Sequence, residues 1–309
     1  MEKALSVIAV IMPILTAMYL GVLSRRTNLI TPDGVQGLQA FVMNIGLPCV
    51  IFNSILTAKV GVESIGVMAL VIPFLVATTL WAYRAGKKKF PYHNLPMMFS
   101  AQESGMLGIP LFMILFGSAQ AYHMAILDLA QAVTAHPTIA ILSSDTGDNP
   151  KAGQILKKVF TSPLVIMCLL TLTLNLTGAG EWLNQIGIGK IITESTVILG
   201  QPVSALMIFS IGYNFSISDQ NRSDIFKLCA VHSLTFALIG GILQLALFLL
   251  PGITSMTRWA VLLFSFLPAS YLAPGLGRSE QDHAVSSGVC SLLTIVTLVV
   301  FCVIAALTA

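Results

Sequence analysis

The stretch SAQESGMLGIPLFMILFG, residues 100–117, decides the fold. It is apolar over most of its length, yet it contains the acid Glu103 and the helix-disturbing residues Gly105, Gly108 and Pro110. Proline inside a helix removes a backbone hydrogen bond, and in lipid the freed groups need protein, water or a ligand as partners. We therefore expect a membrane span that is interrupted around Gly105, Gly108 and Pro110, with Gly108 and Pro110 as helix-breaking residues and Glu103 two residues before Gly105.

A second stretch, FSFLPASYLAPGLG at residues 264–277, contains Pro268 and Pro274 together with two glycines. We expect this stretch to be interrupted as well, with both prolines as helix-breaking residues. Simple kinks are the alternative, but matched interruptions near mid-membrane are typical of a substrate site built from half-helix ends. The inner N-termini of such half-helices would offer partial positive charge to a substrate carboxylate.

The composition excludes a soluble protein. Of the 309 residues, 56% are hydrophobic and 9% are charged, whereas roughly a quarter are charged in an ordinary soluble domain. The formal net charge is only +3, which indicates no surface for nucleic acid. The 5 cysteines lie apart within apolar runs, so neither a disulfide framework nor a metal site is expected. The sequence predicts an all-α polytopic membrane protein.

Ten apolar runs are long enough to cross a bilayer as helices, which takes about 20 residues each. They lie at 4–24, 36–57, 62–83, 94–116, 119–143, 159–178, 193–215, 225–249, 257–276 and 282–307. The first run is about 20 residues long, its basic pair Arg25 and Arg26 follows it, and no A-x-A cleavage site is present, so it is counted as a span and not as a signal peptide. We expect one membrane transport domain over residues 1–309, with repeat one at 1–143, a cytoplasmic joint at 144–157 and repeat two at 158–309.

The two halves are expected to be inverted relative to each other. Five spans per half require opposite insertion, which is the inverted-repeat plan of many secondary transporters. Twelve of the 16 lysines and arginines fall in loops after odd-numbered spans, which places those loops in the cytoplasm and both termini outside. Three pairs of prolines recur at slowly increasing separations in the halves: Pro13 with Pro163, Pro48 with Pro202, and Pro110 with Pro268.

Two acids, Glu103 and Asp128, fall deep within predicted spans, and no lysine or arginine does. An ionised carboxylate in hydrocarbon is costly, so each acid needs a proton, a cation such as Na⁺ or a wet cavity. We expect both to couple transport to a cation. The alternatives are a protonated Glu103 bonded to nearby backbone, and an Asp128 that is wet because it lies near a helix end.

Further polar and small residues close to the two interruptions are candidates for binding a substrate. Each of them alone is also compatible with a simple hydrogen bond between helices. The candidate substrate-binding residues are Asn44, Gln102, Glu103, Ser104, Gly105, Gln131, His136, Pro268, Ser270 and Tyr271.

Several motifs resemble the auxin efflux carrier family. GMLGIPLFMILFG at 105–117 is similar to the signature of the family's fourth span. MNIGLPCVIFNSI at 43–55 resembles its second span, and LMIFSIGYNF at 206–215 resembles its seventh. LPASYLAPGLG, followed by HAVSSGVCSLLTIVT at 283–297, resembles its ninth and tenth spans. The likeness covers the whole chain, and the short central loop resembles that of a prokaryotic member.

The resemblance implies ten spans, with a crossing of spans four and nine. Spans one, two, six and seven would form a scaffold, against which spans three to five and eight to ten would move as an elevator. Family members carry small organic anions, auxin in plants and dicarboxylates such as malonate or malate in bacteria. The resemblance therefore implies a multi-pass protein of the bacterial cytoplasmic (inner) membrane, and it leaves a homodimer open.

At single positions the chain both matches the family and departs from it. Gln131 matches a glutamine of the fifth span, whereas His136 replaces a tyrosine. Ala269 follows Pro268 where plant carriers have a glutamine. Glu103 stands where the family usually has asparagine, and a negative charge there opposes an anionic substrate unless a proton or a cation neutralises it.

The sequence thus predicts a secondary active transporter of a small organic carboxylate, coupled to H⁺ or Na⁺, with no other cofactor. A carrier of the bile-acid/sodium symporter type is an alternative, although the sodium-binding glutamate and glutamine of its ninth span have no counterpart here. A carrier of a non-anionic substrate, or a channel-like pore with the same fold, is a further alternative. A sensor would need a large soluble appendage. No intramembrane-enzyme motif is present, so an enzyme is not expected.

Overall fold

The computed structural model describes residues 2–57, 62–143, 161–215 and 221–308. These residues are almost entirely helical and include no strand. The predicted joint at 144–157 and the first two residues of the predicted span 159–178 lie outside the described residues. Within these described residues, seven helical segments are long and apolar enough to cross a membrane. They are Ile8–Thr27, Pro32–Leu56, Glu63–Lys89, Ser118–Leu142, Ile188–Asn214, Arg222–Leu249 and Glu280–Thr308.

The α-helices follow the predicted apolar runs along the chain. Their bounds are α1 Glu2–Thr27, α2 Pro32–Phe41, α3 Leu47–Thr57, α4 Val62–Trp81, α5 Lys87–Lys89, α6 Leu95–Ser100, α7 Ile109–Phe116, α8 Ala121–Leu142, α10 Pro163–Leu176, α11 Ala179–Gln185, α12 Ile188–Gly200, α13 Val203–Asn214, α14 Arg222–Leu249, α15 Ser255–Phe264 and α16 Glu280–Thr308. The predicted spans 94–116, 159–178 and 257–276 correspond to shorter helices, so a count of ten spans stays a prediction.

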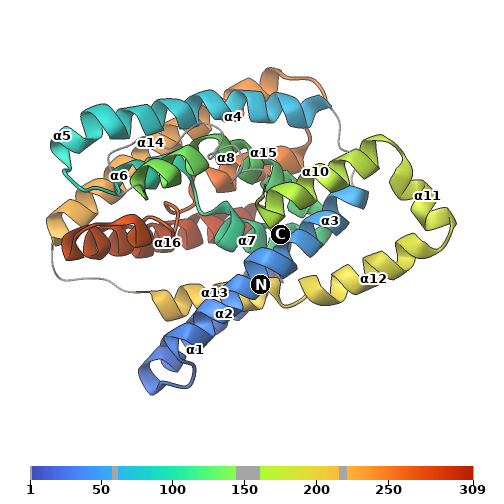
Figure 1. The fold of residues 1–309 in the computed structure, drawn as a ribbon, viewed down its shortest axis with the longest axis horizontal. Coiled ribbons are helices and arrows are strands. Elements are labelled where there is room, and N and C mark those ends of the chain that lie inside the picture. The colour runs from blue at the N-terminus through green and yellow to red at the C-terminus, as the bar shows by residue number, and fades with distance from the viewer. Residues whose placement is uncertain (1, 58–61, 144–160, 216–220, 309) are drawn as a thin grey trace.

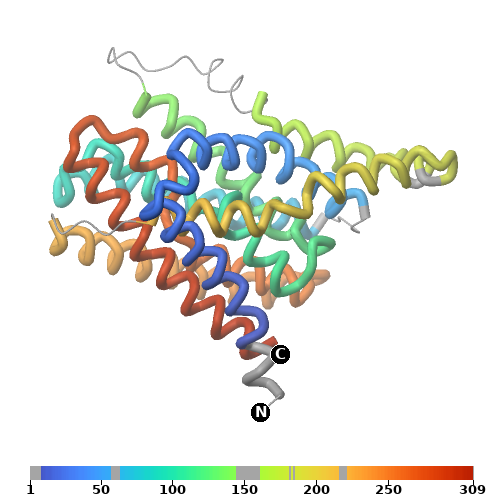
Figure 2. Tube along the Cα trace, turned by 90° about the horizontal axis from the view of Figure 1, so that it is seen from below, coloured from blue at the N-terminus to red at the C-terminus, as the bar shows by residue number. Residues whose placement is uncertain are grey.

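The helices form two groups (Figure 1). One group contains α1–α3 and α10–α13, and the other contains α4–α8 and α14–α16. Within the first group, α1 and α13 approach very closely, because a Cβ atom at Gly21 would lie 2.1 Å from the carbonyl oxygen of Phe209. A Cβ atom at Gly212 would lie equally close to the carbonyl oxygen of Met18. Small residues commonly allow such close packing of membrane helices. The end of α16 lies beside α1 (Figure 2).

The interruption of the fourth predicted span lies earlier than its glycines and proline indicate. The chain leaves the helix at residues 101–103, which we call the first break, and Gly108 and Pro110 lie within the helical part that follows. Pro110 is tolerated there because the wider π-helical turn Ser104–Gly108 precedes it. In this turn the backbone hydrogen bonds already differ from those of an α-helix, so the helix does not depend on the N–H that proline lacks. A similar turn, Val42–Gly46, precedes Pro48 at the start of α3.

The ninth predicted span differs more from the expectation. Helix α15 ends at Phe264, and residues 265–273, which we call the second break, are irregular. Pro268 lies within this break, as predicted, but Pro274 only begins the short 3₁₀ turn Pro274–Leu276. The expected second half-helix is therefore absent from this described segment, because two prolines and two glycines within ten residues prevent a helix from restarting.

Candidate functional site

The two breaks pair with each other, and we call this place the crossing. Gln102 and Ala269 form an isolated antiparallel bridge. On either side of it, Glu103 N donates to the oxygen of Pro268 at 2.8 Å, and Ser270 N donates to the oxygen of Ala101 at 3.1 Å. Backbone groups that left their helices thus satisfy one another, as they must in a dry interior.

Helix α8 satisfies the rest of the first break. The buried side chain of Gln131 accepts a hydrogen bond from Gln102 N at 2.8 Å and donates one to Gln102 O at 2.9 Å. Three residues further along α8, Thr134 Oγ1 donates to the oxygen of Ser100 at 2.5 Å. We assign the Gln102 amide the orientation in which its nitrogen donates to the oxygens of Leu267 at 2.8 Å and Pro268 at 3.1 Å. The first break is therefore held from both sides.

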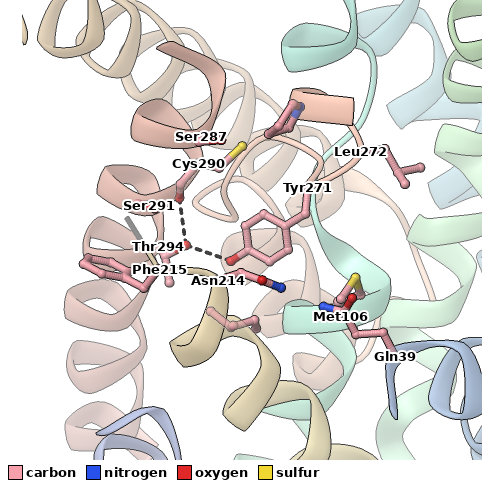
Figure 3. Close-up of a pocket in the computed structure, with 12 residues that line it drawn as sticks. Gln39, Met106, Asn214, Phe215, Tyr271, Leu272, Ser287, Cys290, Ser291 and Thr294 are labelled. Carbon is pink, nitrogen blue, oxygen red and sulfur yellow. Dashed lines mark hydrogen bonds between the residues drawn. The ribbon is translucent and has the colours of Figure 1, made fainter. Parts of the chain in front are cut away.

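Helix α16 serves the second break in the same way. Thr297 Oγ1 donates to the oxygen of Phe266 at 2.5 Å. The hydroxyl of Tyr271 lies 2.7 Å from Thr294 Oγ1 (Figure 3). The thiol of Cys290 lies 3.5 Å from the oxygen of Ala269. Each break thus has its own partner helix that supplies side-chain hydrogen bonds to the unwound backbone.

Glu103 links the two breaks through its carboxylate. Oε1 accepts a hydrogen bond from Met106 N at 3.2 Å, and Oε2 accepts one from Tyr271 N at 2.6 Å. Met106 N belongs to the first turn of the helical segment that begins at Ser104, so Glu103 acts as its N-cap. The side chain is only 7% exposed. A carboxylate that accepts two backbone N–H groups at a helix start is in a favourable electrostatic position.

Asp128 lies in the middle of α8 and faces the first break. Its Oδ1 accepts hydrogen bonds from Ser104 Oγ and from Gln131 Nε2, the latter at 3.0 Å. Within the described residues, Oδ2 accepts no hydrogen bond from the protein. One oxygen of Asp128 is thus fixed by its neighbours, and the other is available to a ligand.

A cavity of about 380 Å³, which we call the main cavity, lies beside the first break. Both Glu103 and Asp128 line it, and no lysine or arginine is among the described residues that do so. His136 also lines it, with Nδ1 at 3.1 Å from the oxygen of Ala132. Much of the remaining wall is apolar, with methionines from three segments. These are Met43, Met97 and Met106.

A second cavity, of about 340 Å³, lies beside the second break. Figure 3 shows Tyr271 and Thr294 pointing toward each other at this place. The polar side chains that line the second cavity are neutral amides, hydroxyls and a thiol, and no acid or base is among its described lining residues. They are Gln39, Asn214, Tyr271, Ser287, Cys290, Ser291 and Thr294.

The structure brings most of the predicted site residues together. The candidates that line the main cavity are Asn44, Gln102, Glu103, Gly105, Asp128, Gln131, His136 and Ser270. Ser104 is fully buried behind the cavity wall, where it bonds Asp128 and Gln131. Tyr271 and Pro274 line the second cavity instead.

The remaining predicted residues act through the backbone or through packing. Pro268 contributes its carbonyl oxygen to the crossing. Gly108 lies where a Cβ atom would come within 2.7 Å of the Leu267 side chain, so its small size lets α7 pack against the second break. Pro110 is buried within α7.

Sequence reasoning missed the second cavity. On α16, Ser287, Ser291 and Thr294 recur every three or four residues and therefore share one helix face. Asn214 at the end of α13 faces the same space. The signal was the small polar stripe on the last span, which would have been found by asking which helix serves the second interruption.

No model of a known protein family matches the chain, and a search of curated proteins finds no significant match. The function is therefore inferred from the residues of the site.

Proposed function

We propose that this chain is a secondary active transporter of small organic ions in the bacterial cytoplasmic membrane. It would consist of two inverted five-helix repeats with both termini outside, as the likeness to the auxin efflux carriers implies. The two groups of helices would then be a scaffold and a moving half. The seven apolar helices that are long enough to cross a membrane are compatible with this arrangement.

One observation carries the proposal: two interrupted segments pair with each other beside a cavity that is lined by the buried Glu103 and the half-buried Asp128. Unwound backbone at membrane depth is tolerated where it is buried in protein or lines a cavity, and transporters use it to bind substrates and coupling ions. Acids in such a place are typically functional.

The two acids favour coupling to H⁺ or Na⁺. A cation in the main cavity would offset the charges of Glu103 and Asp128, for which the described lining offers no lysine or arginine. The organic anion that the family resemblance implies would add a further negative charge, so a co-transported cation would be needed for it as well.

The test uses the full chain reconstituted in liposomes and solid-supported membrane electrophysiology. The probes are small carboxylates and small amines, each applied with and without an inward gradient of Na⁺ or H⁺. We expect saturable transient currents from at least one class of compound, with a dependence on one of the gradients that is lost in Glu103→Gln. Currents from no compound, or flux that never saturates as in a channel, contradict the carrier. Flux that ignores both gradients and is unchanged in Glu103→Gln contradicts the coupling role.

A further inference from the structure

The crossing offers two backbone donors that would suit a carboxylate from solution, and both are already used. Met106 N, at the helix start after the first break, and Tyr271 N, in the second break, point at the same carboxylate, as an anion site at a helix start requires. The carboxylate of Glu103 occupies this place and bonds one donor with each oxygen. The protein thus fills its own anion site with a tethered side chain.

The main cavity lies beside the carboxylate of Glu103, and its lining favours a cation and not an anion. Asp128 presents an oxygen that accepts no protein hydrogen bond within the described residues, next to the carboxylate of Glu103. The one basic group of the described lining is the imidazole of His136, whose Nδ1 is directed at the oxygen of Ala132 on its own helix. The described lining therefore contains two acids and at most one positive charge.

The remaining wall suits an apolar body. Methionines 43, 97 and 106 line it together with Leu129 and Leu164. Methionine side chains are flexible and polarizable, so they adapt to ligands of differing shape. A ligand with one charged end and an apolar body would match both parts of the wall, provided that its charge is positive.

We propose that the ligand of the main cavity is a small organic cation, a protonated amine whose ammonium group bonds Asp128 while its apolar body contacts the methionines. Glu103 would not bind the substrate directly, but would hold the two backbone donors so that no external carboxylate competes for them. This inference rests on the proposed transport function, and it replaces the organic anion with an organic cation.

Equilibrium binding to the purified full chain in detergent tests the inference. The probes are two pairs with matched skeletons: phenethylammonium with 3-phenylpropanoate, and butylammonium with pentanoate. Isothermal titration at neutral pH is expected to detect the ammonium member of at least one pair, and to show at least about tenfold weaker binding of the carboxylate member. In Asp128→Asn, the affinity for the ammonium compound should fall at least about tenfold.

Asp33→Asn is the matched control, because Asp33 lies in the first turn of α2 at an exposed position outside both cavities. It should leave the affinity for ammonium compounds unchanged. The inference is overturned if a carboxylate binds the wild type as tightly as its ammonium partner, if no ammonium compound binds, or if Asp128→Asn binds it as the wild type does.

The same compounds distinguish a failure of this inference from a failure of the proposed transport function. Carboxylate-driven currents in liposomes together with absent ammonium binding would leave a carrier but overturn the organic cation. Ammonium binding that requires Asp128, with no current from any compound, would leave the binding site but contradict transport.

Discussion

The two breaks at the crossing have the same hydrogen-bonding plan but different charge. Glu103 and Ser270 hold equivalent places, because the N–H of each donates to the other segment. On the partner helices, Gln131 and Thr134 of α8 serve the first break, as Thr294 and Thr297 of α16 serve the second. Yet the first break and its partner helix contribute two acids, whereas neutral groups alone line the second cavity among the described residues.

The difference separates what holds the crossing together from what acts on a ligand. The two breaks share one charged group, because the Glu103 carboxylate accepts a hydrogen bond from Met106 N after the first break and one from Tyr271 N in the second. Asp128, in contrast, bonds side chains alone among the described residues, so it is not needed for the unwinding itself. An acid at this depth is costly, so we attribute Asp128 to binding and coupling, and Glu103 to holding the crossing as well as to coupling. Substitutions at corresponding positions of the two breaks and their partner helices can test this assignment of roles, because the hydrogen bonds there have similar geometry.

The largest difference is expected between Glu103→Ala and Ser270→Ala. Loss of the Glu103 carboxylate leaves the donors Met106 N and Tyr271 N without their partner, which should lower the free energy of unfolding by about 2–4 kcal/mol. Ser270→Ala removes only an acceptor for Leu272 N at 3.3 Å and should cost less than about 1 kcal/mol. Unfolding in mixed detergent–SDS micelles measures both values. Equal losses at the two positions would contradict the special role of Glu103.

A smaller difference is expected between the partner helices at Gln131 and Thr294. Gln131→Leu removes the acceptor of Gln102 N and a donor to Asp128, so we expect a loss of about 2–3 kcal/mol. Thr294→Val removes the hydroxyl that bonds the Tyr271 hydroxyl and the oxygen of Cys290 on its own helix, and it should cost about 1 kcal/mol. The same unfolding titration compares the pair. A smaller loss for Gln131→Leu than for Thr294→Val would show that the first break does not depend on its amide.

The smallest difference is expected between Thr134 of α8 and Thr297 of α16, which bond the two breaks in the same way. Thr134→Val and Thr297→Val each remove a hydroxyl that donates at 2.5 Å to a carbonyl oxygen just before or within a break. Both should cost about 1 kcal/mol, and the two values should lie within about 0.5 kcal/mol of each other. Neither variant should change the affinity for phenethylammonium in isothermal titration. A loss of ligand affinity in Thr297→Val alone would show that ligand binding depends on the second break and would contradict the assignment to the main cavity.

Hydropathy predicted an all-helical membrane protein, and seven of the ten predicted runs coincide with membrane-length helices among the described residues, whereas the runs at 94–116, 159–178 and 257–276 contain shorter helices. The sites of interruption were harder to predict. Pro110 marks the neighbourhood of the first break but not its place, because a π-helical turn accommodates it. The recurrence of Pro110 and Pro268 does not locate the crossing, because the carbonyl oxygens that accept hydrogen bonds there belong to Ala101 and Pro268.

The two acids of the candidate site could be predicted from the sequence, because a charge within a membrane span is costly. Glu103 and Asp128 stood out because acids are rare in apolar spans, and both line the main cavity. What Glu103 does with its carboxylate was not predictable, since the donor Tyr271 N comes from a segment far away in the sequence. The second cavity escaped notice because hydroxyls on a helix are common and carry no comparable cost.

The most direct test of the central claim, that Glu103 fills the carboxylate site of its own crossing, is thermal unfolding of Glu103→Ala with and without acetate. Chloride at the same ionic strength serves as the control for salt. We predict that acetate raises the Tm of Glu103→Ala, because it bonds the two vacated backbone donors, and leaves the Tm of the wild type and of Ser270→Ala unchanged. An unchanged Tm of Glu103→Ala, or an equal rise in the wild type, would contradict the claim.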